Sequence, residues 1–155
     1  MPHPRLDPTE AAAEMQRRAA GARAYCPHDP TPKQAEFLAL DCLEALYGGA
    51  AGGGKTDALL MAALQHVHVP GYAALLLRRT YADLALPGAI MDRAKSWLRP
   101  KGIHWDEKNK RFTFPSGATL TFGYLDTEQD RYRYQGAELQ FIGFDELTQF
   151  PEQLV

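Results

Sequence analysis

The chain has 155 residues, of which 45% are hydrophobic, and it carries 17 Lys and Arg against 19 Asp and Glu. This length and composition fit one domain with a hydrophobic core. A net charge of −2 excludes a globally basic protein, so any polyanion must be bound locally. Two cysteines, Cys26 and Cys42, are too few for a disulfide framework and suit an intracellular chain. No apolar run is long enough for a membrane span or a signal peptide, and we expect a cytoplasmic protein without a membrane partner.

Residues 1–29 are expected to form an N-terminal arm. Asp7 followed by Pro8 predicts the start of a short helix, and Gly21 is expected to end it. The apolar face of this helix is mostly alanine and methionine, which bury little surface. We therefore expect the arm to dock loosely or to stay mobile.

Residues 30–155 are expected to form the compact domain. The sequence "TPKQ" predicts a helix start, because its Thr and Gln form a capping box and its Pro occupies the first helical position. Residues 43–49, "LEALYGG", predict a short strand that runs into glycines. Residues 54–67 are apolar nearly all round and predict a helix covered on several sides. The continuous apolar run "GYAALLLRRT" predicts a buried parallel strand.

The second half of this domain adds a helix, a hairpin and a final strand. Residues 81–98 predict a helix that Pro87 and Gly88 interrupt. "KRFTFPSGATLTFGYL" alternates in hydrophobicity around a turn and predicts an antiparallel hairpin, extended to a meander by "GIHW". "ELQFIGFDEL" predicts an apolar strand that ends in two carboxylates. Together these elements predict an α/β fold, with a parallel sheet flanked by helices and an inserted antiparallel hairpin.

The glycine-rich stretch after the first predicted strand matches the phosphate-loop pattern G-x-x-x-x-G-K-[ST]. Small residues let the backbone N–H groups approach phosphate oxygens, and the following helix adds the partial positive charge of its N-terminus. Lys55 is expected to neutralise the outer phosphates, and the Thr56 hydroxyl to bind Mg²⁺. The alternative is a simple glycine-rich turn with a solvated lysine. The predicted nucleotide-binding residues are Gly49, Ala50, Ala51, Gly52, Gly53, Gly54, Lys55 and Thr56.

The stretch "FIGFDEL" offers the second half of a site. Asp145 is expected to hold Mg²⁺ through its water shell, and Glu146 to polarise an attacking water. Because side chains alternate along a strand, the two carboxylates serve one site only if the strand ends there. The alternative is two solvated acids at a strand exit. A glutamate after the aspartate favours hydrolysis over a kinase reaction.

Several other polar residues have two interpretations. Gln34 either belongs only to the capping box or hydrogen-bonds adenine. Arg78 and Arg79 follow a predicted strand at the sheet edge, where they are either solvated or act as an arginine finger, within the chain or on a neighbouring subunit. Arg131 and Arg133 alternate with tyrosines and fit a solvated face better than a phosphate-backbone contact.

The order of "PTPKQAEFL", "YGGAAGGGKT", "LLLRRTYADL" and "YRYQGAELQFIGFDELTQF" resembles the N-terminal ATPase part of tailed-phage terminase large subunits. The resemblance covers residues 30–155. It implies a P-loop NTPase of the additional-strand, RecA-like class that uses ATP and Mg²⁺. By this likeness the matching positions are Gln34 for the adenine-side glutamine, residues 49–56 for Walker A, Asp145 for Walker B, Glu146 for the catalytic acid, and Arg78 or Arg79 for the strand-end arginine.

The resemblance also implies a function and partners. The family couples ATP hydrolysis to the packaging of double-stranded DNA into a procapsid, in the host cytoplasm. Its members dock on a portal protein, where a homo-oligomeric ring is expected, work with a small terminase subunit, and carry a separate nuclease domain. The alternatives are another P-loop translocase or helicase and a nucleotide-binding module without turnover.

Two features depart from the family pattern. Many relatives place an arginine in the phosphate loop, where this chain has Ala50 and Ala51, so that role falls to Arg78 or Arg79 or is absent. The chain also ends at Val155, before the family's coupling motif, nuclease domain and additional strand. We therefore expect residues 30–155 to form an incomplete domain that is unstable, prone to aggregation or open at its sheet.

Overall fold

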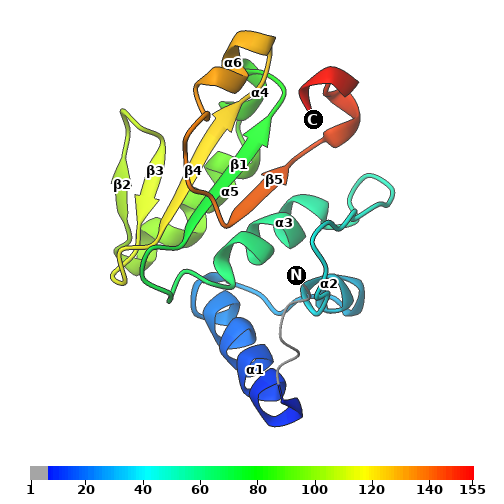
Figure 1. Ribbon diagram of the computed structural model, residues 1–155, viewed down its shortest axis with the longest axis vertical. Helices are drawn as coiled ribbons and strands as arrows, with labels where there is room; N and C mark the ends of the chain where they lie inside the picture. The colour runs from blue at the N-terminus through cyan, green and yellow to red at the C-terminus, as the bar shows by residue number, and fades with distance from the viewer. Residues whose placement is uncertain (1–6) are drawn as a thin grey trace.

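The structure, a computed structural model, describes residues 7–155 and contains a mixed five-stranded sheet (Figure 1). The strand order is β2-β3-β4-β1-β5. The strands are β1 (Ala73–Arg78), β2 (His104–Asp106), β3 (Arg111–Thr113), β4 (Thr119–Tyr124) and β5 (Phe141–Phe144).

Strand β1 pairs in parallel with β4 on one side and with β5 on the other. Its middle four residues are buried, which confirms the buried parallel strand predicted from the continuous apolar run. Strands β2, β3 and β4 form the predicted antiparallel meander. The prediction of an antiparallel hairpin inserted in the parallel scheme is confirmed as well. Strand β4 pairs with both β3 and β1, so the hairpin joins the parallel strands in one mixed sheet.

Two helices supply most of the core on one face of the sheet. Helices α3 and α5 pack with Leu76 of β1 and Leu120 of β4 in the larger hydrophobic cluster. A smaller cluster on the other face joins Leu75 and Leu77 to Leu125 and Phe150. The α-helices are α1 (Pro8–Tyr25), α2 (Pro32–Leu38), α3 (Lys55–Leu64), α4 (Tyr81–Leu84), α5 (Ile90–Leu98) and α6 (Glu128–Tyr132), and the 3-10 helices are η1 (Arg99–Lys101), η2 (Leu147–Gln149) and η3 (Glu152–Leu154). The break between α4 and α5 falls at Pro87 and Gly88, as predicted.

Helix α1 extends beyond its predicted end. It continues through Gly21 to Tyr25, because Gly21 faces helix α3 at close range. A Cβ atom at Gly21 would lie 3.0 Å from the carbonyl oxygen of Gln65, so this glycine permits the contact between two helices instead of ending one. Ala22 is the buried residue of α1, and the contact is shallow, as an alanine-rich face implies. Both α1 and α2 lie on the far side of α3 from the sheet (Figure 1).

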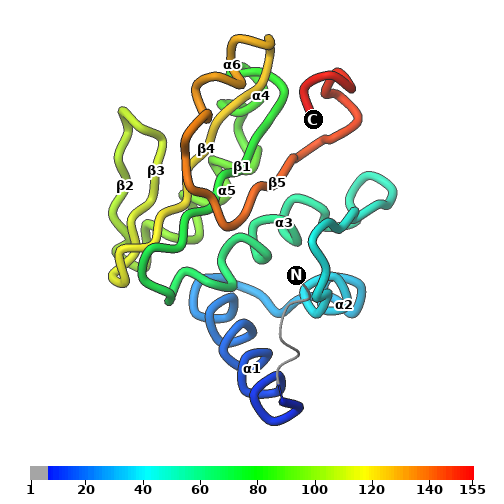
Figure 2. Tube along the Cα trace, in the orientation of Figure 1, coloured from blue at the N-terminus to red at the C-terminus, as the bar shows by residue number. Residues whose placement is uncertain are grey.

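The strand predicted for residues 43–49 is absent from the structure. This segment runs as a loop between α2 and α3 (Figure 2), and its Leu43 and Leu46 side chains are 95% and 78% exposed. Within residues 7–155 no strand lies beside it, and an extended segment without a ladder partner gains no sheet hydrogen bonds. Strand β5 is an edge strand, and its Ile142 is 51% exposed.

Candidate functional site

The glycine-rich loop, residues 48–54, leads directly into α3. Gly54 is the N-cap of this helix, with a left-handed φ of 70°, and Gly52 has a φ of 80°. Residues with a Cβ atom rarely adopt these angles, so the backbone conformation favours glycine at both positions. A Cβ atom at Gly54 would also lie 2.5 Å from Nε2 of Gln34.

Side-chain donors hold four carbonyl oxygens of this loop. Three of the four donors lie outside α3, and two of those belong to α2. The pairs are Lys33 Nζ with Gly48 O at 2.5 Å, Lys55 Nζ with Gly49 O at 2.9 Å, Tyr47 Oη with Gly53 O at 3.1 Å, and Gln34 Nε2 with Gly54 O at 2.9 Å.

The N–H groups at the same place have no partners. No hydrogen-bond acceptor within residues 7–155 pairs with the backbone N–H of Gly54, Lys55 or Thr56. The first N–H groups of a helix have no intrahelical acceptor, and they carry the positive end of the helix dipole. The arrangement can therefore bind an anion through backbone N–H groups, with the Lys55 ammonium nearby.

Gln34 is 1% exposed and uses both ends of its amide. Its Oε1 accepts from Thr31 N at 2.9 Å, Gln34 N donates to Thr31 Oγ1 at 3.3 Å, and Nε2 donates to Gly54 O. The capping box is confirmed. The contact to adenine stays a prediction, and it requires a different rotamer because every polar atom of the side chain is engaged here.

Asp145 lies where β5 ends and is 4% exposed. Its N–H donates to Leu77 O at 2.9 Å, which continues the pairing of β5 with β1 by one residue. Thr56 Oγ1 donates to its Oδ1 at 3.3 Å, and Arg78 Nη1 donates to its Oδ2 at 3.1 Å. The pKa of the Asp145 carboxyl is raised, mainly by burial and to a smaller extent by the nearby Glu146 charge. The charge and hydrogen bond of Arg78 and the hydrogen bond of Thr56 lower the same pKa and offset part of this rise. The start of α3 and the ends of β1 and β5 thus meet at one carboxylate.

Glu146 has an unusual backbone conformation. Its φ is 57°, and Glu146 and Lys110 are the two residues other than glycine with positive φ within residues 7–155. The left-handed conformation ends the alternation of β5 immediately after Asp145, as the two-carboxylate interpretation requires. The Glu146 side chain is exposed. Its catalytic role stays a prediction.

The two strand-end arginines have different surroundings. The Arg78 side chain is 12% exposed and faces Asp145, and its Nε is buried without a hydrogen-bond partner in the described part of the chain. The Arg79 guanidinium instead donates to the Leu125 carbonyl and to both the carbonyl and the carboxylate of Asp126, in the loop after β4. Only Arg78 therefore lies at the candidate site, and which arginine acts as a finger stays a prediction.

A second polar network fixes the N-terminal part of the chain to α3. His28 Nε2 lies 2.8 Å from Asp57 Oδ2, His28 Nδ1 lies 3.0 Å from Asp29 O, and Arg93 Nη1 lies 2.6 Å from Asp57 Oδ1. Both partners of the His28 ring are acceptors, so the ring satisfies both only when it carries two protons. The hydrogen bond to the Asp29 carbonyl and then the Asp57 carboxylate raise the pKa of His28, against desolvation and the Arg93 charge.

Sequence reasoning missed Lys33, Tyr47 and this network. Lys33 and Tyr47 lie outside the loop pattern, and no spacing rule links them to it. The His28–Asp57 pair spans 29 positions along the chain, so only the fold reveals it.

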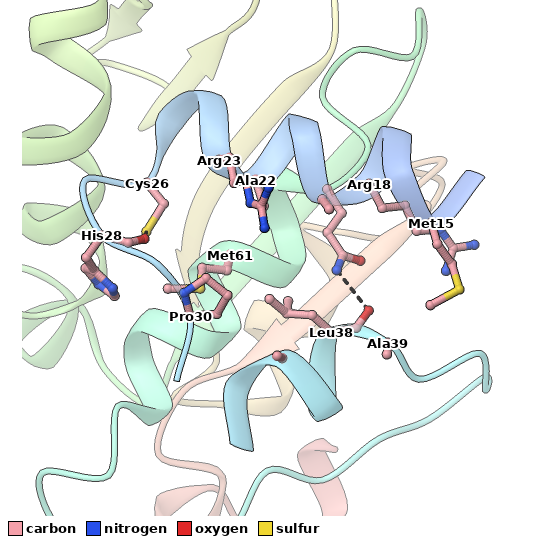
Figure 3. Close-up of a pocket in the computed structure, with 13 residues that line it drawn as sticks. Met15, Arg18, Ala22, Arg23, Cys26, His28, Pro30, Leu38, Ala39 and Met61 are labelled. Atoms are coloured by element: carbon pink, nitrogen blue, oxygen red, sulfur yellow. Dashed lines mark hydrogen bonds between the residues drawn. The ribbon is translucent and has the colours of Figure 1, made fainter. Parts of the chain in front are cut away.

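A cavity of about 210 Å³ lies between α1, α2 and α3 (Figure 3). Its walls are mainly apolar, including Met15, Ala22, Leu38 and Met61, and a hydrogen bond from Gln65 Nε2 to Leu38 O crosses it at 3.0 Å. None of the predicted nucleotide-binding or carboxylate residues lines it. The cavity follows from the small side chains with which α1 packs on the domain.

The candidate metal ligands are few. Within residues 7–155 no group of three or more His, Cys, Asp or Glu side chains is placed to hold a metal ion. Thr56 and Asp145 offer one hydroxyl and one carboxylate, which suits Mg²⁺ because this ion keeps several waters and takes further oxygens from phosphates.

In the described part of the chain, no helix has the length and apolar character needed to cross a membrane.

The glycine-rich loop and the Asp145 cluster both lie inside a segment that matches a known family. Residues 46–155 match the model for the N-terminal part of T4-like-virus-type terminase large subunits. The chain belongs to this family. No curated protein and no solved structure gives a significant match. The matched segment of this terminase chain contains the loop, α3 and all five strands, whereas α1 and α2 lie before it. Family membership supports a general role in viral DNA packaging.

Proposed function

We propose that this terminase chain binds ATP with Mg²⁺ and hydrolyses it as the motor domain of a DNA-packaging machine. One observation carries the proposal. The loop before α3 has four carbonyl oxygens held by side-chain donors, and the N–H groups at the start of α3 are unpaired. The Thr56 hydroxyl at the start of α3 lies 3.3 Å from Oδ1 of the buried Asp145. An anion site and a carboxylate thus lie side by side, which a nucleotide–metal complex requires.

Each residue has a distinct task in this proposal. The N–H groups of Gly54, Lys55 and Thr56 bind phosphate oxygens, and the Lys55 ammonium exchanges its contact with Gly49 O for the phosphates. Thr56 Oγ1 and Asp145 hold the metal. Bound Mg²⁺ neutralises phosphate charge, and ATP supplies the free energy for movement.

Glu146 is the proposed general base. Its left-handed backbone turns the chain away from the strand just beyond Asp145 and leaves the carboxylate exposed, so that it can orient a water molecule and accept its proton. Arg78 positions Asp145 from β1. Arg78 or Arg79 acts as the arginine finger that stabilises the charge of the transferred phosphate.

The proposed partners follow from the family. They are double-stranded DNA, a portal protein and a small terminase subunit, with the motor acting as a homo-oligomeric ring at the portal. A net charge of −2 implies that DNA is contacted by a local patch and not by a basic surface.

The test measures Mg²⁺-dependent ATP binding and phosphate release by the full chain. Lys55→Ala is expected to abolish binding, and Glu146→Gln to keep binding but reduce hydrolysis by about 10²-fold or more. Glu152→Gln removes the same charge from an exposed glutamate in η3 and is the matched control. Binding without hydrolysis in the wild-type chain would instead support a nucleotide-binding module. Full hydrolysis by Glu146→Gln would show that the base is assigned wrongly.

A further inference from the structure

Lys33 lies at the glycine-rich loop although it belongs to α2. Its ammonium donates to Gly48 O at 2.5 Å and lies 5.0 Å from the centre of the Tyr47 ring. A Cβ atom built on Gly49 would lie 3.2 Å from the same ammonium. Lys33 thus approaches the loop from outside the sequence pattern that defines it.

Two ammonium groups therefore donate hydrogen bonds to consecutive carbonyl oxygens of one loop. Lys33 binds Gly48 O, and Lys55 binds Gly49 O at 2.9 Å. Neither takes part in an ion pair within residues 7–155, whereas Lys95 and Lys110 both pair with Glu107. Like charges repel each other, so two ammonium groups on one loop without a paired carboxylate favour the binding of an anion.

We propose that Lys33 is a second phosphate-binding cation of the nucleotide site, supplied by α2. This inference rests on the proposed ATP site and adds a residue to it. A bound polyphosphate supplies the negative charge that the two ammonium groups lack. The Lys33 side chain is exposed, so it is free to leave Gly48 O and follow a phosphate oxygen.

A purely structural role makes a different prediction. If Lys33 only anchors the loop through Gly48 O, then any long donor serves, and charge is irrelevant. Lys33→Gln separates the two roles, because glutamine keeps an N–H donor, one bond closer to the backbone than the lysine ammonium, and removes the charge. Lys33→Arg keeps the charge. Lys108→Gln, in the turn between β2 and β3, makes the same charge change at an exposed site away from the loop.

The experiment measures dissociation constants of the full chain for fluorescent ATP, ADP and AMP analogues with Mg²⁺, at several salt concentrations, together with thermal unfolding. We expect Lys33→Gln to weaken ATP binding about tenfold, with a smaller effect on AMP and a shallower salt dependence. Lys33→Arg and Lys108→Gln should bind like the wild type. All variants should unfold at about the wild-type temperature.

The outcomes distinguish this inference from the function on which it rests. If Lys55→Ala abolishes binding but Lys33→Gln binds all three nucleotides like the wild type, Lys33 is a loop anchor and the inference is wrong. An equal loss for ATP and AMP with an unchanged salt dependence overturns it as well. If the wild-type chain binds no nucleotide, the proposed function itself fails, and the role of Lys33 fails with it.

Discussion

Replacing Gly54 with alanine should reduce the free energy of unfolding by more than the backbone strain of a left-handed alanine alone. Gly54 has a φ of 70°, and alanine in the left-handed region costs about 1–2 kcal/mol. The new Cβ atom would also lie 2.5 Å from Nε2 of Gln34, a side chain that is 1% exposed. Gln34 must then move, which breaks its bonds to Gly54 O and Thr31 N and leaves buried polar groups unpaired, at about 1–3 kcal/mol. The expected loss is about 2–5 kcal/mol.

Gly52→Ala is the matched control. Gly52 has a similar φ of 80°, but no atom lies within 4 Å of the position that its Cβ atom would take. Its replacement should cost only the backbone term of about 1–2 kcal/mol. The free energy of unfolding of both variants can be measured by urea denaturation with circular dichroism.

A double-variant cycle tests the contact itself. Gln34→Ala removes the side chain that Gly54→Ala would strike, so the double variant should lose about 1–2 kcal/mol less than the sum of the single losses. Equal losses for Gly54→Ala and Gly52→Ala, or strict additivity in the cycle, would refute the packing of Gln34 against this glycine.

Three further predictions concern the ion pair at β5, the His28 network and the sheet edge. Arg78→Met should destabilise the fold by about 3–5 kcal/mol in urea, because it leaves a buried carboxylate unpaired; wild-type stability would contradict this. The pKa of His28 is raised by the Asp29 carbonyl and then by Asp57. The protonated His28 ring therefore stabilises the fold fully below the ordinary pKa of 6.5, and this contribution is lost as pH rises through the higher folded-state pKa. His28→Gln should therefore reduce the free energy of unfolding at pH 5.5 by under about 1 kcal/mol after solvent screening, and lower the melting temperature slightly, with no such change at pH 9. An equal effect at both pH values would exclude the protonated ring. Ile142→Lys, on edge strand β5, should reduce self-association in light scattering, and unchanged scattering would show that this edge is not the contact.

The features that the sequence predicts correctly depend on neighbouring residues. The apolar run of β1, the break at Pro87 and Gly88, and the capping box at Thr31 each follow from a few consecutive side chains. The end of β5 at Asp145 is of the same kind. Such patterns act through local backbone geometry and burial, so they can be recognised without the fold.

The features that the sequence predicts wrongly depend on distant partners. Residues 43–49 have the composition of a strand, but a strand requires a neighbour, and residues 7–155 provide none beside them. Gly21 has the usual identity of a helix terminator, yet it lies inside α1 because the backbone of Gln65 approaches it. Local alternation predicts the β3–β4 hairpin correctly, but it does not name β1 as the second partner of β4, because that pairing is set by the fold.

The candidate site depends both on the local loop pattern and on side chains that lie outside it. The pattern supplies the glycines, Lys55 and Thr56, but donors outside it, Lys33, Gln34 and Tyr47, hold the carbonyl oxygens. These donors engage the carbonyl oxygens of Gly48, Gly53 and Gly54 and leave the N–H groups at the start of α3 unpaired, so the proposed anion site depends on both α2 and α3. A chain that kept the pattern but lost these donors would have the same glycines in a loop free to turn its carbonyl oxygens toward a phosphate, and it should bind nucleotide poorly.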